Sequence, residues 1–257
     1  MRILLTGASG GIGSALALAF ARDGHTLLLQ GRRMDRLEQL CASLPGDEHR
    51  SVAADLRSDS DRERLAAEAE SFGIDTLCNN AGINQFSAFP DTDVAALIET
   101  NVTATLELTQ RLLPQLLQRE EPRVVFIGSA FGAIGFPGYS VYCASKFALR
   151  GFAEALAREY VDTALQIHYF APRATDTAMN DPRVTAMNRA LGTTVDTPES
   201  VARQVLEALK QARPRLQLGS AEAFQARLNA LAPGLVDRAL RGKLATIQKY
   251  LKETPHV

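Results

Sequence analysis

Short runs of apolar residues recur along the chain and alternate with longer stretches of helical periodicity. The runs have the length and composition of buried strands and cover residues 2–6, 26–30, 51–54, 76–78, 123–128, 165–170 and 215–218. Between them, apolar residues repeat with the period of a helix, for example at 13–22 and 61–72. Strands that alternate with helices favour right-handed crossovers and a sheet covered on both faces. The pattern therefore predicts an α/β protein with a doubly wound, seven-stranded parallel sheet.

The C-terminal third of the chain contains two recognisable helix boundaries. Thr197 has the side chain of a helix N-cap, Pro198 fits the first turn, and Glu199 suits the positive end of a helix. Helical periodicity resumes near residue 220 and breaks at Pro233. We expect one helix after Thr197 and a helical tail in two parts.

Length, composition and charge narrow the class of protein. The chain has 257 residues, of which 46% are apolar, and a formal net charge of -1. These values suit one α/β domain, with its main part at residues 1–220 and residues 221–257 as a helical extension of it. The small net charge provides no general attraction to nucleic acid.

The cysteines and the longest apolar runs bear on location. Cys41, Cys78 and Cys143 lack metal-ligand spacing, and the four histidines do not cluster with them, so we expect reduced thiols and no metal site. No apolar run approaches the ~18 residues of a transmembrane helix. The first strand begins almost at the first residue, without a preceding signal sequence. We therefore expect a cytoplasmic protein.

A glycine-rich segment, TGASGGIG at residues 6–13, follows the first strand and opens a helix. Glycine allows a tight turn there and lets the backbone approach a pyrophosphate, which the positive end of the helix attracts. A glycine loop without a ligand is the alternative. The strand before it and the helix after it favour a dinucleotide site.

Tyr142 and Lys146 lie four residues apart at the start of a strongly helical segment, residues 144–160, so they share one face of the helix. A free tyrosine has a pKa of about 10, and a nearby ammonium favours its phenolate form. Such a tyrosine can exchange a proton with a carbonyl or alcohol oxygen. Ser129, at the end of the fifth strand, lies where ligands bind in open α/β sheets.

The glycine spacing resembles that of the short-chain dehydrogenase/reductase family, and further segments match the pattern of that family. Asp55-Leu56 follows the third strand, Asn-Asn-Ala-Gly at residues 79–82 follows the fourth, and Asn101 lies on the next helix. The resemblance covers about residues 1–220. It implies a Rossmann-type fold and an oxidoreductase that interconverts a ketone or aldehyde and an alcohol by hydride transfer to or from a nicotinamide dinucleotide.

The resemblance also implies a role for each matching residue. The catalytic set would be Asn101, Ser129, Tyr142 and Lys146. Tyr142 would act as acid/base, Ser129 would orient the substrate oxygen, and Lys146 would also bind the nicotinamide ribose. Asn101 would hold a water that links Lys146 to solvent, and Asp55 would hold the adenine ring. The cofactor would contact Gly7, Ser9, Gly11, Ile12, Gly13, Arg32, Asp55, Leu56, Asn80, Ala81, Gly82, Tyr142, Lys146, Pro172 and Thr177.

Cofactor choice depends on the end of the second strand, where Gly31 and Arg32 stand in place of the carboxylate that an NAD enzyme uses to bind the ribose 2′-hydroxyl. A guanidinium binds a 2′-phosphate, whereas a carboxylate repels it. We therefore expect NADP(H) rather than NAD(H). A solvated arginine at the start of a helix is the alternative.

Two segments near the expected substrate site depart from the family pattern or are open to two interpretations. Pro172-Arg173 replaces the frequent Pro-Gly after the sixth strand, and Thr177 matches the threonine that contacts the nicotinamide carboxamide. Arg173 either points outward or binds an anionic part of the substrate. The apolar, glycine-rich segment 130–139 forms a pocket wall or packs on a partner subunit. We expect residues 173–194 to form a substrate-contacting loop.

Three hypotheses for the function stay open. The first is a carbonyl reductase or alcohol dehydrogenase that acts on a hydrophobic small molecule. The second is a catalytically silent, dinucleotide-binding regulator with the same fold. The third is a lipid reductase attached to a membrane. The intact catalytic set favours an enzyme because a pure sensor needs no acid/base group.

The last expectations concern the oligomeric state and the C-terminal tail. The resemblance implies a homodimer or homotetramer formed through helices near residues 92–118 and 144–160. A stripe on the second helix packs either on a partner or on the chain's own sheet; it consists of Ala144, Ala148, Phe152, Ala155 and Leu156. The tail, residues 220–257, carries a net charge of +3 and a leucine-rich helical pattern. We expect it to cover the substrate entrance, with subunit packing or an anionic membrane surface as alternatives.

Overall fold

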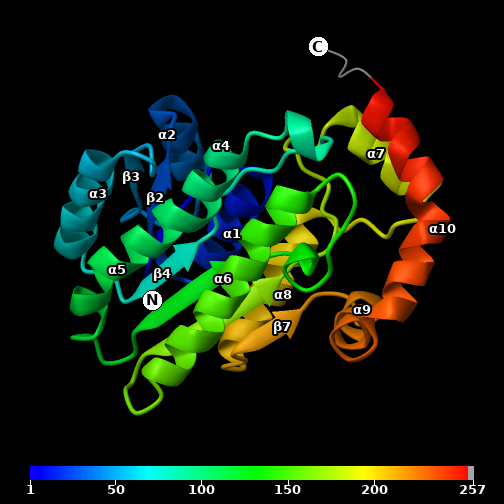
Figure 1. Ribbon diagram of the computed structural model, residues 1–257. Coiled ribbons are helices and arrows are strands. Elements are labelled where there is room, and N and C mark those ends of the chain that lie inside the picture. Colours follow the sequence, from blue (N-terminus) through cyan, green and yellow to red (C-terminus); the bar gives the residue numbers. More distant parts are fainter. Residues whose placement is uncertain (254–257) are drawn as a thin grey trace.

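The computed structural model describes residues 1–253. Parallel strands form a single sheet in the order β3-β2-β1-β4-β5-β6-β7 (Figure 1). The strands are β1 (Arg2–Leu5), β2 (Thr26–Gly31), β3 (Arg50–Ala53), β4 (Thr76–Asn79), β5 (Arg123–Ile127), β6 (Gln166–Ala171) and β7 (Arg215–Gln217). Each of the seven predicted strands is present, with ends that differ by one residue at most, and the predicted α/β architecture is confirmed.

Helices cover both faces of the sheet (Figure 1). One layer consists of α1 (Gly11–Arg22), α2 (Met34–Ser43) and α8 (Pro198–Lys210), and the other of α3 (Asp59–Phe72), α5 (Ala104–Leu116) and α6 (Ser140–Glu159). Thr197 caps α8 as predicted, because its side chain accepts from the backbone N–H of Ser200. Shorter elements are α4 (Val94–Ile98), a π-helical turn (Glu99–Thr103) and two 3₁₀ turns (Phe89–Asp91 and Ala130–Gly132).

The core consists of two apolar layers separated by the sheet. Successive strand residues point to opposite faces, so Ile3 and Leu5 pack under α1 and α8 while Leu4 packs under α3 and α5. Both faces are dry, which is why the strands appear in the sequence as continuous apolar runs rather than as alternating patterns. The same packing fixes the register of the strands and therefore the positions of the loops at their carboxyl ends.

The strand order reverses between β1 and β4. From β1 the chain builds outward through β2 and β3, and then crosses to β4 and builds in the other direction. The loops that leave β1 and β4 consequently diverge, and an open parallel sheet has its ligand crevice at such a point. The glycine-rich loop and the Asn-Asn-Ala-Gly segment lie at this reversal.

The C-terminal helices extend beyond the edge of the sheet. They are α9 (Ser220–Leu231) and α10 (Pro233–Lys252), and α10 runs beside α7 (Pro182–Ala190) (Figure 1). The predicted two-part tail is confirmed. The expectation of a loop over residues 173–194 is wrong in part, since Asp181 caps a helix there whose Val184 and Met187 are buried.

Candidate active site

The glycine-rich loop between β1 and α1 exposes its backbone at the crevice. Gly7 has a φ of +62°, and a Cβ built on Gly13 would lie 2.2 Å from the carbonyl oxygen of Gly7, so neither position accepts a side chain. The helix α1 starts after Gly10 without a side-chain cap, and its first turn contains no acidic residue. Uncapped N–H groups and the positive end of the helix thus face the crevice, which fits an anionic dinucleotide.

Side chains from neighbouring strands hold this loop in place. The Thr6 hydroxyl accepts from the backbone N–H of Asn80 at 3.0 Å, and the Asn80 amide donates to the carbonyl oxygens of Thr6 and Gly7 at 3.0 and 3.2 Å. Gln30 accepts from the N–H of Gly7 at 3.0 Å and donates to the carbonyl oxygen of Ala54 at 2.7 Å. Gln30 is not recognisable from the sequence, because its position in an apolar strand gives no sign that its amide joins two loops.

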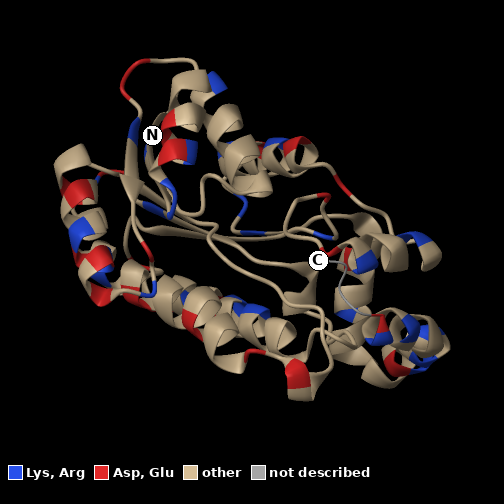
Figure 2. Cartoon of the chain, turned by 90° about the horizontal axis from the view of Figure 1, so that it is seen from above, with Lys and Arg blue, Asp and Glu red and all other residues tan. Residues whose placement is uncertain are grey.

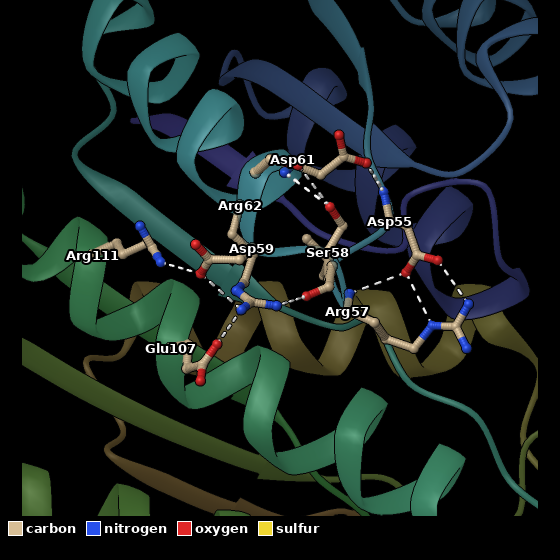
Figure 3. Close-up of polar contacts among 10 residues, drawn as sticks. Asp55, Arg57, Ser58, Asp59, Asp61, Arg62, Glu107 and Arg111 are labelled. Atoms are coloured by element: carbon tan, nitrogen blue, oxygen red, sulfur yellow. Dashed lines mark hydrogen bonds and ion pairs between the residues drawn. The ribbon is translucent and has the colours of Figure 1, made fainter.

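The expected adenine site lies after β3, where Asp55 is paired with Arg57 (Figure 3). The Arg57 guanidinium donates to both carboxylate oxygens, at 2.7 and 3.2 Å, and this pairing lowers the pKa of Asp55 from its ordinary value. Asp55 is therefore ionised at neutral pH and held in a fixed orientation. Arg57 is a second residue at this site that the sequence analysis did not single out.

A buried arginine of α3 links the adenine-side loop to the neighbouring helix α5. Arg62 donates to the carbonyl oxygen of Leu56 at 2.6 Å and pairs with Asp59 at 3.1 Å and with Glu107 on α5 (Figure 3). Asp59 of α3 also pairs with Arg111 of α5. A buried cation is tolerated only with such partners, so the network fixes the loop that carries Asp55 and Leu56.

Arg32 and Arg33 differ in their surroundings although they are neighbours at the end of β2. Arg33 forms a two-point pair with Asp35 at 2.6 and 3.2 Å. Arg32 is exposed, has no hydrogen-bond or ion-pair partner within residues 1–253, and lies close enough to Asp55 to lower the pKa of that carboxyl. Arg32 thus has an open guanidinium near Asp55, and its contact with a 2′-phosphate stays a prediction.

Ser129 and Tyr142 meet at the carboxyl end of β5. Ser129 follows the strand and its hydroxyl accepts from the N–H of Phe131 at 3.1 Å, while Tyr142 lies in the first turn of α6. The Ser129 side chain lies close enough to Tyr142 to lower the pKa of its phenol, but burial outweighs that influence and raises the pKa to about 12.

Lys146 lies one helical turn beyond Tyr142 and is buried. Its Nζ lies 5.7 Å from the centre of the Tyr142 ring and donates to the carbonyl oxygen of Ile127 at 3.3 Å. Burial lowers the pKa of Lys146 to about 8. We expected the ammonium to favour the Tyr142 phenolate, but Lys146 is not among the groups that shift the pKa of Tyr142. Burial has the largest effect, so Tyr142 is protonated at neutral pH.

Asn101 is fully buried in the π-helical turn before α5. Its side-chain amide accepts from the N–H of Ile83 at 2.8 Å and donates to the carbonyl oxygen of Ile83 at 2.9 Å and to Ser145 at 3.1 Å. A Cβ on Gly82 would lie 3.2 Å from the Asn101 oxygen and 3.7 Å from Lys146 Nζ, so the three groups adjoin. The amide thus ties the loop after β4 to α6, a positioning role that the sequence analysis did not predict.

Tyr169 lies behind Ser129. A Cβ built on Gly128 would lie 2.3 Å from the Tyr169 oxygen, and one built on Gly132 would lie 2.4 Å from it. The phenol is buried, and burial raises its pKa to about 12, with an opposing effect from the Ser129 backbone. These two glycines therefore accommodate a large side chain from β6 beneath the predicted substrate-orienting serine, which sequence spacing alone does not reveal.

The segment after β6 lies across the glycine-rich loop. A Cβ on Gly11 would lie 2.8 Å from Cγ2 of Thr177, so Thr177 lies directly over the start of α1. Arg173 forms a two-point pair with Asp196 at 2.8 and 2.9 Å and a longer contact with Glu222 of α9 at 3.5 Å. Arg173 thus joins the base of the substrate segment to the C-terminal helices instead of pointing outward.

An aromatic cluster surrounds Tyr142 and consists of Phe86, Phe131, Phe136, Tyr139 and Tyr142. The segment 130–139 thus packs within its own chain, as a pocket wall would. Helix α10 closes this cluster, because Ile247 is fully buried in it and Leu251 packs against it. Beside it, a cavity of about 490 Å³ lies between residues 84–91, α7 and the end of α10.

Comparisons with known proteins agree with this geometry. A family model described as short chain dehydrogenase matches residues 1–188. Nodulation protein G of Rhizobium sp. (strain N33) is 36% identical, over 78% of this chain and 87% of its own length. Ketoacyl reductase HetN of Nostoc sp. (strain PCC 7120 / SAG 25.82 / UTEX 2576) is 35% identical, over 81% of this chain and 75% of its own.

A solved structure gives the same result for the fold. A short-chain dehydrogenase from Sphingobium yanoikuyae in complex with NADPH superposes with a TM-score of 0.78 at 28% identity, over 92% of this chain and 95% of that one. The chain belongs to the short-chain dehydrogenase/reductase family, an oxidoreductase family that uses a nicotinamide dinucleotide.

Proposed function

We propose that the protein is an NADP(H)-dependent oxidoreductase that interconverts a ketone or aldehyde and an alcohol. The observation that carries the proposal is that Ser129 and Tyr142 lie together at the carboxyl end of β5, with Lys146 one helical turn away. Ser129 orients the substrate oxygen and Tyr142 exchanges a proton with it. The bound nicotinamide supplies or accepts the hydride.

The state of the two titratable groups favours proton donation. Tyr142, with a pKa of about 12, holds its proton at neutral pH and can give it to the oxygen of a carbonyl whose carbon gains a hydride. Lys146 holds the ribose of the cofactor and, with Asn101, returns a proton to Tyr142 through water. We therefore propose reduction of a carbonyl as the direction for which this site is arranged.

NADP(H) is the proposed cofactor because Arg32 is open and exposed at the adenosine end of the crevice. A guanidinium binds a phosphate through two parallel hydrogen bonds, and Asp55 with Arg57 would flank the adenine. The NADPH complex of the Sphingobium relative supports the same choice. The substrate is proposed to be apolar, since aromatic side chains surround Tyr142.

A silent dinucleotide-binding regulator is the competing function, and one variant pair separates the two. Tyr142→Phe should lower kcat for carbonyl reduction by about 10²–10⁴-fold and leave NADPH binding unchanged, because the ring still packs while the proton donor is lost. Tyr139→Phe is the matched control, since it removes a buried phenol from the same cluster. NADPH oxidation with a panel of ketones and aldehydes measures both. Equal rates for wild type and Tyr142→Phe would contradict the mechanism, and a wild type inactive on every carbonyl would favour the regulator.

A further inference from the structure

The outer face of α10 is basic. With 100° per residue, Arg238, Arg241, Lys249 and Lys252 fall within an arc of about 80° on the side opposite the buried Ile247. All four are exposed. Blue segments gather on the C-terminal helices in Figure 2. The apolar face of α10 closes the aromatic cluster, and Nζ of Lys249 lies 5.6 Å from the centre of the Tyr250 ring.

The cations of the hairpin α9–α10 are unneutralised. Within residues 1–253, no ion pair involves these four residues, nor Arg227 or Lys243. The acidic residues of the hairpin do not compensate, since Glu222 is turned inward to Arg173 and only Asp237 is exposed. Residues 220–257 carry +3 on a chain of net -1, so the rest of the protein carries -4.

Large apolar side chains accompany this charge. Phe224 is 64% exposed, Leu231 86% and Leu235 58%. Phe224 and Leu231 are seven residues apart on α9 and share one face of it, and Leu235 follows directly after the turn into α10. Exposed apolar residues and unpaired cations on the same pair of helices are typical of a segment that lies in a lipid interface.

The inner face of the same hairpin borders the proposed active site. Asn229 donates to the carbonyl oxygen of Ala133 at 2.9 Å, Glu222 contacts Arg173, and Leu251 and Glu253 line the cavity beside the aromatic cluster. Whatever binds the outer face of the hairpin is therefore held next to the substrate entrance.

We propose that the α9–α10 hairpin binds an anionic lipid surface, with its cations on the headgroups and Phe224, Leu231 and Leu235 in the interface. Negative headgroups complement the charge of the hairpin, whereas a second copy of the chain would bring the same positive face against itself. The inference goes beyond the proposed chemistry and does not require it. If both hold, the substrate is an apolar carbonyl or alcohol taken up from the membrane.

Vesicle co-sedimentation of the full chain tests the proposal. Wild type should bind vesicles of phosphatidylcholine mixed with phosphatidylserine, release in high salt, and not bind pure phosphatidylcholine. Arg238→Gln/Lys249→Gln should lower the partition coefficient by about 25-fold, at about fivefold per cation. Arg22→Gln/Arg203→Gln is the matched control, since it removes two exposed cations from α1 and α8 and should change nothing.

Further variants separate the alternatives. Leu231→Ser/Leu235→Ser should also weaken vesicle binding, because the interface loses apolar contact. No sedimentation of wild type with anionic vesicles at low salt would overturn the proposal. A drop in light-scattering mass on Leu231→Ser/Leu235→Ser, without vesicle binding, would assign the face to self-association. Reduction of a water-soluble carbonyl should be the same in Arg238→Gln/Lys249→Gln and wild type, so failure of the proposed chemistry is recognised independently.

Discussion

Arg32 and Arg33 are neighbours in the sequence but have different surroundings, so we expect only Arg32 to bind the cofactor. Arg33 forms an ion pair with Asp35, whereas Arg32 forms no ion pair within residues 1–253 and lies near enough to Asp55 to lower its pKa. Arg32→Ala should weaken NADPH binding by about 10–100-fold, since a charge-assisted hydrogen bond contributes roughly 1.5–3 kcal/mol, and Arg32→Asp should erase or reverse the preference over NADH by repulsion. Fluorescence titration of both cofactors measures this. Arg33→Ala is the control and should change neither affinity. Wild type that binds both cofactors equally would refute the assignment.

Lys146 determines the pH dependence at the residue scale. Its pKa of about 8 means that it loses its proton as pH rises through about 8, whereas Tyr142 stays protonated up to about 12. The kcat/KM for carbonyl reduction should therefore decline above about pH 8. Lys146→Arg, which stays charged, should move the decline to higher pH. A rate profile that stays flat to pH 10 in wild type would show that the ammonium is not required.

Lys146 also makes the free energy of unfolding depend on pH. Folding lowers the pKa of Lys146 from 10.5 to about 8, so between these values the unfolded chain binds more protons than the folded one. The contribution of Lys146 to the free energy of unfolding thus rises with pH across that window. The cost of burying the ammonium is present in full below about pH 8, where function needs the charge.

At the scale of elements, α10 acts as a cover for the aromatic cluster. Deleting residues 234–257 should raise KM for hydrophobic carbonyls more than it weakens NADPH binding, because Ile247 and Leu251 leave the cluster while the glycine-rich loop is untouched. Ile247→Ala tests the same contact without a deletion, and the exposed Gln248→Ala is its control. Steady-state kinetics and circular dichroism check the outcome. A folded truncation with unchanged KM would exclude a lid.

At the scale of the whole molecule, the stripe on α6 divides into two parts. Phe152 packs edge-on against Phe126 with ring centres 5.7 Å apart, and Leu156 is buried, so both cover the chain's own sheet. Ala144, Ala148 and Ala155 are exposed. Two residues of the stripe thus cover the chain's own sheet, and packing of the three exposed alanines on a partner stays a prediction.

The exposed part of that stripe leads to a prediction about assembly. Small side chains let helices approach closely, and we expect two copies to pack through α5 and α6. Light scattering should give at least twice the chain mass of 27.8 kDa. Ala148→Glu should reduce this to one chain by placing like charges at the interface, whereas Ala67→Glu on the exposed side of α3 should not. A monomeric wild type at micromolar concentration would refute the interface.

The sequence by itself determined the fold class, the strands and the residues that meet in the site. Apolar runs show buried strands because a sheet covered on both faces leaves no polar alternation. The residues 6–13, Ser129, Tyr142 and Lys146 come together because parallel strands bring their carboxyl ends to one edge. The division at residue 220 stays a prediction.

Only the tertiary structure decided which atoms each side chain contacts. Gln30 gains its partners from segments distant in sequence, and Arg57 gains its partner from the conformation of one loop. Tyr169 lies against two glycines, Gly128 and Gly132, from another part of the chain. It also turned Arg173 from a candidate substrate ligand into a link to α9. Such partners depend on the packing of whole elements, and helical or strand periodicity specifies which face is buried but not which atoms lie across from it.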